Sequence, residues 1–367
     1  MRIPLFDTES QLQGLRATIL ERIAAVVADG RFILGPEVEA FERELAAYVE
    51  VKHAIGVANG TDALTIAARA LELGPGDDVV LPSFTFYATA EAIANTGARP
   101  VFCDVDHDTR NVTPQTVREA LTGRTKAIVA VDLFGNPAPV PELREIGLPV
   151  IEDAAQALGS SLHGRRAGSL GDVATVSFYP SKNLGALGDA GAVLTADDEL
   201  AGRIRALRFH GSRDKRTFQY VGYNSRLDEL QAAVLRVLLP HLDEWSDARR
   251  AAAAHYAAAG IAQHVGVTAP TAGAMPAWHL YVITHPQADE LLEALARAGV
   301  QARGYYRTPL HRQPAMSQFV APGASLPVTE ELARTNLALP MAPSLGEEAI
   351  ERVAAAIAAF SAADAAA

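Results

Sequence analysis

The sequence predicts an α/β protein built on a mainly parallel sheet. From residue 54 to residue 179, short apolar segments of strand length alternate with segments of helix length, the pattern of βαβ units. The chain has 367 residues, of which 49% are hydrophobic and 20% charged, so it is long enough to bury a sizeable core. In such sheets a ligand binds beyond the carboxyl ends of the strands, and we expect the functional residues there.

The chain is expected to begin with helices. Residues 9–29 carry apolar side chains at helical spacing, and Gly30 is a suitable stop. A turn at 32–36 leads to a second helix over 37–48. The alternating part then supplies strands at 54–58, 78–82, 100–105, 126–131, 149–152 and 173–179, and helices at 62–73, 85–95, from Thr113 onward and at 141–146.

A second, smaller domain is expected after these units. A helical tract over 227–259 should bend or break at Pro240, because proline has no N–H to donate within a helix. Beyond it the sequence predicts a strand over 278–284 and helices over 288–298 and 347–360. We therefore expect a large domain of residues 1–240 and a small C-terminal domain of residues 241–367.

Charge and composition exclude several kinds of function. The net charge of −11 and the isoelectric point near 5.4 argue against a nucleic-acid or anionic-membrane surface. No apolar run approaches the roughly 18–20 residues of a membrane span, and the start lacks the pattern of a secretory signal, so we expect a cytoplasmic enzyme. Cys103 is the only cysteine, which excludes an internal disulfide. The ten histidines show no HxH or HExxH spacing, and no metal site is expected.

One lysine stands in an unusual setting. Lys182 lies between a strand-like run that ends near Tyr179 and a loop with glycines at 185, 188 and 191, which let the backbone turn sharply and approach a ligand. Apolar neighbours such as Leu184 would partly remove the amine from water and lower its pKa toward neutrality, as a Schiff-base lysine requires. Taken alone, the stretch fits a lysine in an ordinary surface turn equally well.

A phosphate site is predicted where a strand ends in a glycine turn and a helix begins. The free amides of the first helical turn at Gly60 and Thr61, and the Thr61 hydroxyl, can hold a phosphate at the positive end of the helix dipole. Asp62 belongs to the same turn, and a simple helix cap is its alternative role. The turn is neither a Walker loop nor a GxGxxG, so a nucleotide triphosphate or a nicotinamide cofactor is not indicated.

Two further residues complete a candidate cofactor site. Asp153 ends a buried strand, where a carboxylate usually has a cation to meet, and it precedes Lys182 by 29 positions (182 − 153). Phe86 follows another strand end, where its ring can cover a flat group, although core packing explains a single phenylalanine as well. An acid for a ring nitrogen, a lysine for an imine, a phosphate cradle and an aromatic cover together indicate pyridoxal 5′-phosphate.

Four segments carry a resemblance to a known family. Residues 59–64, 151–157, 177–185 and 222–233 closely resemble the DegT/DnrJ/EryC1/StrS family of sugar aminotransferases, and the likeness extends over nearly the whole chain. It implies a type I aminotransferase fold: a large domain that binds pyridoxal 5′-phosphate on a mainly parallel, seven-stranded-type sheet flanked by helices, and a smaller C-terminal α+β domain.

The resemblance implies roles for individual residues around the cofactor ring. Lys182 matches the lysine that holds the cofactor as an imine, and Asp153 matches the partner of the pyridine nitrogen. Gln156 matches the residue near the phenolic oxygen, and Phe86 the aromatic residue stacked on the ring.

At the phosphate end, Gly60, Thr61 and Ser177 match the family's cradle, with Asp62 beside them. Asn224 matches a residue that reaches the phosphate from the neighbouring subunit of a homodimer, so a homodimer with shared active sites is expected.

The loop around Tyr306 and His311 matches the family's sugar-nucleotide pocket less closely. This chain has Tyr305-Tyr306-Arg307 where His-Tyr-Pro is more frequent, and Ala190 stands where glycine is usual after the lysine. Both Tyr306 and His311 are nevertheless expected to contact substrate.

The resemblance implies transfer of an amino group from L-glutamate to a nucleotide-linked keto-sugar, in the first place to C3 of a dTDP-3-keto-6-deoxyhexose. Amination at C4 or of a UDP-linked 2-acetamido-3-keto sugar is the near alternative, and a cyclitol acceptor is more distant. The family's dehydratase branch has histidine in place of the lysine, and the presence of Lys182 argues against it. A non-catalytic regulatory protein on the same fold is the alternative from another class.

Overall fold

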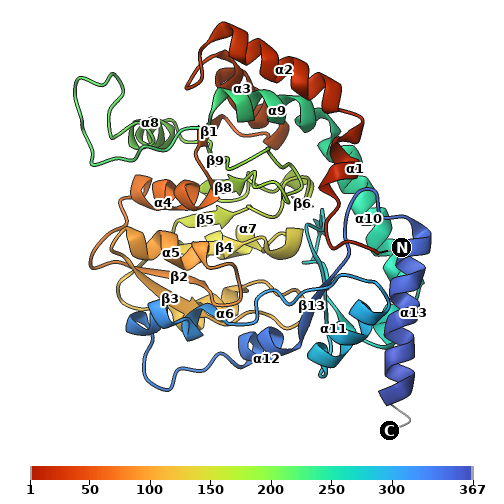
Figure 1. Cartoon of the computed structure of the whole chain (residues 1–367). Helices are drawn as coiled ribbons and strands as arrows, with labels where there is room; N and C mark the ends of the chain where they lie inside the picture. Colours follow the sequence, from red (N-terminus) through yellow and green to blue (C-terminus); the bar gives the residue numbers. More distant parts are fainter. Residues whose placement is uncertain (1, 365–367) are drawn as a thin grey trace.

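The computed structural model describes residues 2–364 (Figure 1). Within these residues seven strands form one sheet in the order β1-β9-β8-β5-β4-β2-β3. Their bounds are His53–Val57 (β1), Asp78–Pro82 (β2), Arg99–Cys103 (β3), Thr125–Val131 (β4), Val150–Asp153 (β5), Val173–Ser177 (β8) and Gly191–Thr195 (β9). Only β9 runs antiparallel to its neighbours in this sheet, β1 and β8. The predicted fold class, an α/β fold with a mainly parallel seven-stranded sheet, is confirmed.

Strand β9 does not follow from the sequence pattern. The loop expected to run through Gly191 ends earlier, because Gly191 is the first residue of β9, and that expectation is wrong. A Cβ atom added to Gly191 would lie 2.5 Å from the carbonyl carbon of Asn59. Glycine at this position therefore lets β9 begin directly against the turn that starts the helix after β1.

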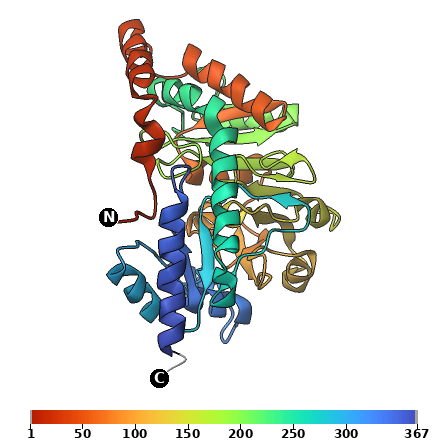
Figure 2. The same ribbon diagram turned by 90° about the vertical axis from the view of Figure 1, so that its right-hand side faces the viewer.

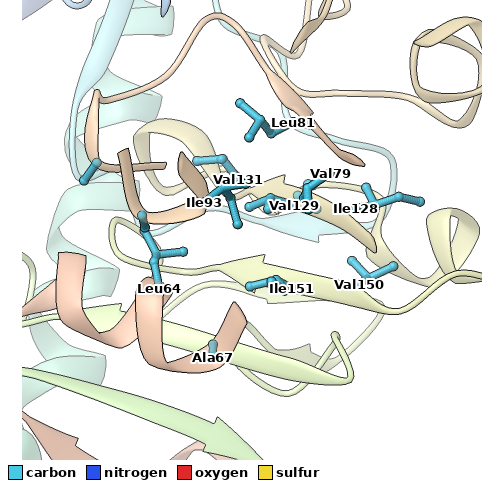
Figure 3. Packing of buried hydrophobic residues seen from close by; sticks show 14 of the residues in the cluster. Leu64, Ala67, Val79, Leu81, Ile93, Ile128, Val129, Val131, Val150 and Ile151 are labelled. Carbon is cyan, nitrogen blue, oxygen red and sulfur yellow. The ribbon is translucent and has the colours of Figure 1, made fainter. Parts of the chain in front are cut away.

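Helices cover both faces of the large sheet, so its strands are buried and read as apolar runs in the sequence. The helices that follow its strands are Gly60–Ala70 (α4), Ala88–Asn95 (α5), Pro114–Ala120 (α6), Val140–Arg144 (α7) and Asp198–Leu207 (α8). Figure 3 shows Leu64 and Ala67 of α4 directed toward Ile151 of β5. Each large apolar side chain buried in this way contributes about 1.5–3 kcal/mol, which fixes the start of α4 relative to the strand ends.

A layer of helices lies at the β1 end of the sheet in Figure 1: Arg16–Asp29 (α2), Pro36–Val49 (α3) and Glu229–Leu238 (α9). A short helix, Thr8–Gln13 (α1), precedes α2 in the chain. The single helix expected over 9–29 is wrong, because the chain breaks between Gln13 and Arg16. Glu229 links two of these helices: its buried carboxylate accepts the N–H groups of Gly35 at 2.8 Å, Glu37 at 2.9 Å and Val38 at 2.9 Å. It thereby caps α3, whose first amides have no partner inside the helix.

The C-terminal part is built on two long helices and a small sheet. The expected break at Pro240 is confirmed by a 3₁₀ turn, Leu239–His241, between α9 and α10 (Leu242–Ala258). Figure 2 shows α10 beside α13, Glu347–Asp364. The sheet consists of β10 (Gly266–Val267), β12 (Tyr281–Thr284) and β13 (Asn336–Leu339), with α11 (Ala288–Arg297) and α12 (Pro327–Thr335) nearby in the chain.

Smaller elements complete the fold. A second three-stranded sheet joins β6 (Ser161–Leu162), β7 (Arg165–Arg166) and β11 (Ala274–Met275). Further 3₁₀ turns are Leu133–Gly135, Ile261–Gln263, Leu310–Arg312 and Pro314–Phe319. The division into domains of residues 1–240 and 241–367 stays a prediction. No helix within residues 2–364 is long and apolar enough to cross a membrane.

Candidate active site

A cavity of about 890 Å³ opens at the carboxyl ends of the parallel strands. It is lined by residues that follow β1, β2 and β8, by the end of β5, and by the segments around residues 279 and 305. Most of the residues selected from the sequence meet there: Gly60, Thr61, Asp62, Phe86, Asp153, Gln156, Ser177, Lys182 and Tyr306. The fold therefore brings segments more than 200 positions apart to one place.

The first turn of α4 forms one end of this cavity. The helix begins at Gly60, and Asn59 caps it by accepting the N–H of Asp62 at 2.8 Å, so the capping role considered for Asp62 belongs to Asn59. A Cβ atom on Gly60 would lie 2.8 Å from the Cβ of Ser177. Glycine thus allows the helix start to touch the end of β8. The N–H groups of Gly60 and Thr61 lie in the first turn of α4, where backbone N–H groups have no acceptor within the helix. They can therefore donate hydrogen bonds to an anion.

Lys182 and Asp153 face the same cavity. Burial lowers the pKa of the Lys182 amine to about 8, and the negative charge of Asp153 opposes this shift. The loop that carries the lysine is tight: the Lys182 N–H donates to the Tyr179 carbonyl at 2.8 Å, and a Cβ atom on Gly185 would lie 2.4 Å from the Pro180 carbonyl oxygen. The backbone therefore holds the amine at the cavity in a state that can gain or lose a proton near neutral pH.

The Asp153 carboxylate is held by two donors. The Thr89 hydroxyl donates to its Oδ2 at 3.0 Å, and the Ala155 N–H donates to its Oδ1 at 3.3 Å. Burial raises the pKa of Asp153, whereas the Thr89 hydrogen bond, the Ala155 hydrogen bond and the charge of Lys182 lower it. The Thr89 hydrogen bond fixes the orientation of the carboxylate.

Two aromatic side chains, Phe86 and Tyr306, also line the cavity. The rings of Phe86 and Tyr306 lie 5.9 Å apart, and 55% of Phe86 is exposed, which leaves its face free to cover a ligand. Gln156 accepts the Phe134 N–H at 2.7 Å and donates to the Tyr306 hydroxyl at 3.0 Å. These two hydrogen bonds fix Gln156 and Tyr306 relative to each other.

Two of the selected residues do not line this cavity. His311 is buried elsewhere, with Nδ1 2.7 Å from the Ser83 hydroxyl and Nε2 3.0 Å from Glu330, so both ring nitrogens have partners. Asn224 is exposed on the loop between α8 and α9 and does not reach the cavity of its own chain. The expected contacts of both residues with ligand stay predictions.

The structure adds site residues that sequence reasoning did not assign. Thr89 orients Asp153, and its place one helical turn after Phe86 was the available signal. His279 is only 4% exposed, lines the cavity and stacks on Phe6 with centroids 6.0 Å apart. Burial and the charge of Lys182 place the pKa of His279 well below its ordinary value, so the imidazole is neutral. Arg303 lines the rim, and no sequence pattern marks it.

A pair of buried acids lies directly behind the site. Asp132 follows β4, Glu152 precedes Asp153, and neither is exposed. Glu152 accepts the N–H groups of Leu170 at 2.8 Å and Gly171 at 2.9 Å. Asp132 Oδ1 accepts the Ala138 N–H at 2.8 Å, but no N–H or O–H group of residues 2–364 donates to its Oδ2. Burial raises the pKa of both carboxyls, and the Glu152 charge raises that of Asp132 further. A proton on Asp132 thus gives the pair a hydrogen bond.

The solved structures that share this mainly parallel sheet over 98% of the chain, with 40–44% identity, are aminotransferases, so the fold and its site are of the aminotransferase class. Comparison with known proteins specifies the family: the chain belongs to the DegT/DnrJ/EryC1/StrS aminotransferase family, whose model matches residues 13–358. The resemblance drawn from the four sequence segments is confirmed. Across the described part of the chain, no group of three or more His, Cys, Asp or Glu residues could hold a metal ion.

Relatives with different names are similar over almost the whole chain. A pleiotropic regulatory protein of Geobacillus stearothermophilus is 44% identical over 98% of this chain and 99% of its own length. The dTDP-3-amino-3,4,6-trideoxy-alpha-D-glucose transaminase of Streptomyces venezuelae is 46% identical over 94% of this chain and 92% of its own. The crystal structure of S. venezuelae DesV in complex with a ketimine intermediate has a TM-score of 0.95 and 44% identity, and the match covers 98% of both chains.

The reactivity of Lys182 is expected to follow a shifted titration. In the cofactor-free protein, acylation of Lys182 by an amine-specific reagent should rise with a midpoint near pH 8, because only the neutral amine reacts. In Asp153→Asn the midpoint should fall, since the Asp153 charge raises the pKa of the amine. Mass spectrometry of the peptide that carries Lys182 measures the rate at each pH. A midpoint above 10, or one that rises in the variant, contradicts the interaction.

The acid pair behind the site predicts a stability that depends on pH. A carboxyl whose pKa is raised in the folded state stabilises the protein at low pH and loses this contribution as pH rises toward the folded pKa. In the Asp132→Asn variant, the amide oxygen can still accept the Ala138 N–H, and the amide NH₂ can donate to the Glu152 carboxylate at every pH. Its free energy of unfolding in urea should exceed that of the parent by about 1–3 kcal/mol at pH 9, with a smaller difference at pH 5. An equal difference at both pH values counts against a shared proton.

Proposed function

We propose that this protein is a pyridoxal 5′-phosphate-dependent aminotransferase that moves an amino group from L-glutamate to a nucleotide-linked keto-sugar. The observation that carries the proposal is the meeting of Lys182 and Asp153 at one cavity with the N-terminus of α4. The acceptor we favour is C3 of a dTDP-3-keto-6-deoxyhexose, supported by the 46% identity to the S. venezuelae transaminase. Amination at C4 and of a UDP-linked 2-acetamido-3-keto sugar are the competing reactions.

The residues of the cavity fit this cofactor. At one end, the glycine contact at Gly60 brings the first turn of α4 against Ser177, and its amides can bind the phosphate. At the other end, Asp153 can bind a protonated pyridine nitrogen, and the exposed face of Phe86 can cover the ring. When bound, the cofactor supplies an electron sink for the carbon that loses its proton.

The protein itself supplies proton transfer and orientation. The Lys182 Nζ atom has a pKa of about 8. It can therefore accept a proton from the α-carbon of the donor and deliver it to C4′ of the cofactor. Asp153 keeps a negative charge at the far edge of the site, and Thr89 fixes its direction. His279, neutral at working pH, offers one donor and one acceptor beside Lys182 without adding a charge.

The protein is further proposed to act as a homodimer with shared sites. Large apolar side chains are exposed on α2 and on the loop between α8 and α9: Leu20 is 60% exposed, Val27 58%, Phe218 58% and Val221 86%. Surfaces of this kind favour association. The loop extends away from the body of the chain beside α8 (Figure 1), and Asn224 lies at its base, where it forms a β-bridge with Phe209. In the proposed dimer, Asn224 of one chain would lie at the phosphate end of the cavity of the other chain.

The removal of the lysine tests the proposed reaction. Lys182→Ala should abolish formation of 2-oxoglutarate from labelled glutamate, with dTDP- and UDP-linked keto-sugars offered separately, and should abolish the visible absorbance of the bound cofactor. Lys126→Ala, which changes an exposed lysine at the start of β4, is the matched control and should retain both properties. Circular dichroism checks that both variants are folded. A Lys182→Ala protein that keeps activity excludes the proposed role. A parent protein that is inactive on every acceptor favours the regulatory alternative.

Mixing two variants tests the shared site. Asn224→Ala should bind the cofactor phosphate weakly and have low activity, and Lys182→Ala should have none. After exchange of subunits, a mixed dimer has one cavity with both Lys182 and Asn224, so activity should rise above the sum of the separate variants. Light scattering gives the particle mass, expected at twice the chain mass of 38.8 kDa. A monomeric particle, or no gain on mixing, contradicts shared sites.

A further inference from the structure

The main cavity has few positive charges for an anionic substrate. Its lining contains three acids, Asp62, Asp153 and Asp189, and two cations, Lys182 and Arg303. Lys182 is partly buried near Asp153 and has a lowered pKa, so its charge is not permanent. Arg303 is exposed and carries a guanidinium, the side-chain cation that proteins do not deprotonate. It is therefore the one lasting positive charge that this chain's described residues contribute to the cavity.

The backbone of Arg303 is fixed while its guanidinium is free. The Ala338 N–H of β13 donates to the Arg303 carbonyl at 2.7 Å, and the Arg303 N–H donates to the Ala338 carbonyl at 3.2 Å. The guanidinium carbon lies 5.3 Å from the centre of the Tyr305 ring, a cation–π contact. Within residues 2–364 the guanidinium has no hydrogen bond and no acidic partner. The backbone position of Arg303 is thus fixed, and the N–H groups of its guanidinium are available to donate hydrogen bonds to an anion.

A second cavity adjoins the first at this residue. It has a volume of about 840 Å³ and lies between the N-terminal segment and the end of α11. Phe6, Arg303 and Tyr305 line both cavities, and the second also contains Arg2 and Gln301. No acid is among its lining residues, although the whole chain has a net charge of −11. The second cavity is thus a local positive region with aromatic walls.

We infer that Arg303, assisted by Arg2, binds the diphosphate of the nucleotide-linked substrate, and that the second cavity accepts the nucleoside. This inference rests on the proposed function. In such a substrate the diphosphate joins the sugar to the nucleoside, and Arg303 joins the cavity of Lys182 to the second cavity. A planar guanidinium binds two phosphate oxygens at once, and the Phe6 and Tyr305 rings can contact a base. The sugar then extends from Arg303 toward Lys182.

Substitution of Arg303 tests the inference through substrate affinity. Arg303→Gln should raise KM for the nucleotide-linked keto-sugar roughly 10- to 100-fold, as expected for the loss of a charge-assisted bidentate contact. Arg303→Lys should recover part of the affinity, because lysine keeps the charge without the paired geometry. The spectral half-reaction with L-glutamate alone should change far less than KM for the nucleotide-linked sugar, since that donor has no diphosphate. Arg297→Gln, on the exposed side of α11 outside both cavities, is the matched control.

A binding measurement separates this inference from the proposed reaction. Isothermal titration with dTDP and with UDP should give a weaker affinity for Arg303→Gln than for the parent and the Arg297→Gln control, and the difference should shrink at high salt. Equal affinities of Arg303→Gln and parent overturn the inference, even if transamination is found. Loss of the glutamate half-reaction in Arg303→Gln also overturns it, because the residue would then serve the donor. If no acceptor reacts but dTDP binding depends on Arg303, the nucleotide site stands and the proposed reaction fails.

Discussion

The chemistry available to this protein depends on holding one amine out of water beside one carboxylate. Burial alone would lower the pKa of Lys182 further, and the Asp153 charge limits the fall, so the amine titrates near pH 8. This balance requires the loop after β8 to fold tightly, which only glycine at 185 allows. It also requires β5 and β8 to be neighbours, as they are in the parallel sheet. The pairing of β5 with β8 therefore helps to set the pKa of the Lys182 amine.

Three buried acids lie at the strand ends, and they cannot all be ionised at once. Asp132, Glu152 and Asp153 lie at the adjacent ends of β4 and β5, and burial raises the pKa of each. Three buried negative charges so close together would be strongly unfavourable. Glu152 is stabilised by backbone N–H groups and Asp153 by Thr89 and the nearby Lys182 charge, whereas Asp132 has one N–H donor. The remaining proton belongs on Asp132, which leaves Asp153 free to carry the charge at the cavity.

The sequence predicts the parts of the fold that have a simple physical signature. Buried parallel strands read as short apolar runs, and most strands of the large sheet follow from them. Strand β9 was not predicted because it follows directly from a glycine-rich loop, and α8 and α12 were not predicted because charged residues interrupt their short apolar patterns. Lys182, Asp153 and Gly60 reach the cavity because strand ends of one sheet meet at one edge. Tyr306 and His311 come from an irregular loop, where spacing does not determine direction, and only Tyr306 lines the cavity.

The distribution of charge between the two cavities determines how a dianionic substrate can enter. A chain of net charge −11 repels it at long range, but salt screens this repulsion beyond roughly 8–10 Å, so recognition has to be local. Within the main cavity, the acids Asp62, Asp153 and Asp189 disfavour binding of the substrate's diphosphate. Arg303 stands at the boundary with a cavity lined by no acid. The inferred position of the diphosphate is therefore beside Arg303, which would direct the sugar inward, with its uncharged carbonyl carbon toward the amine.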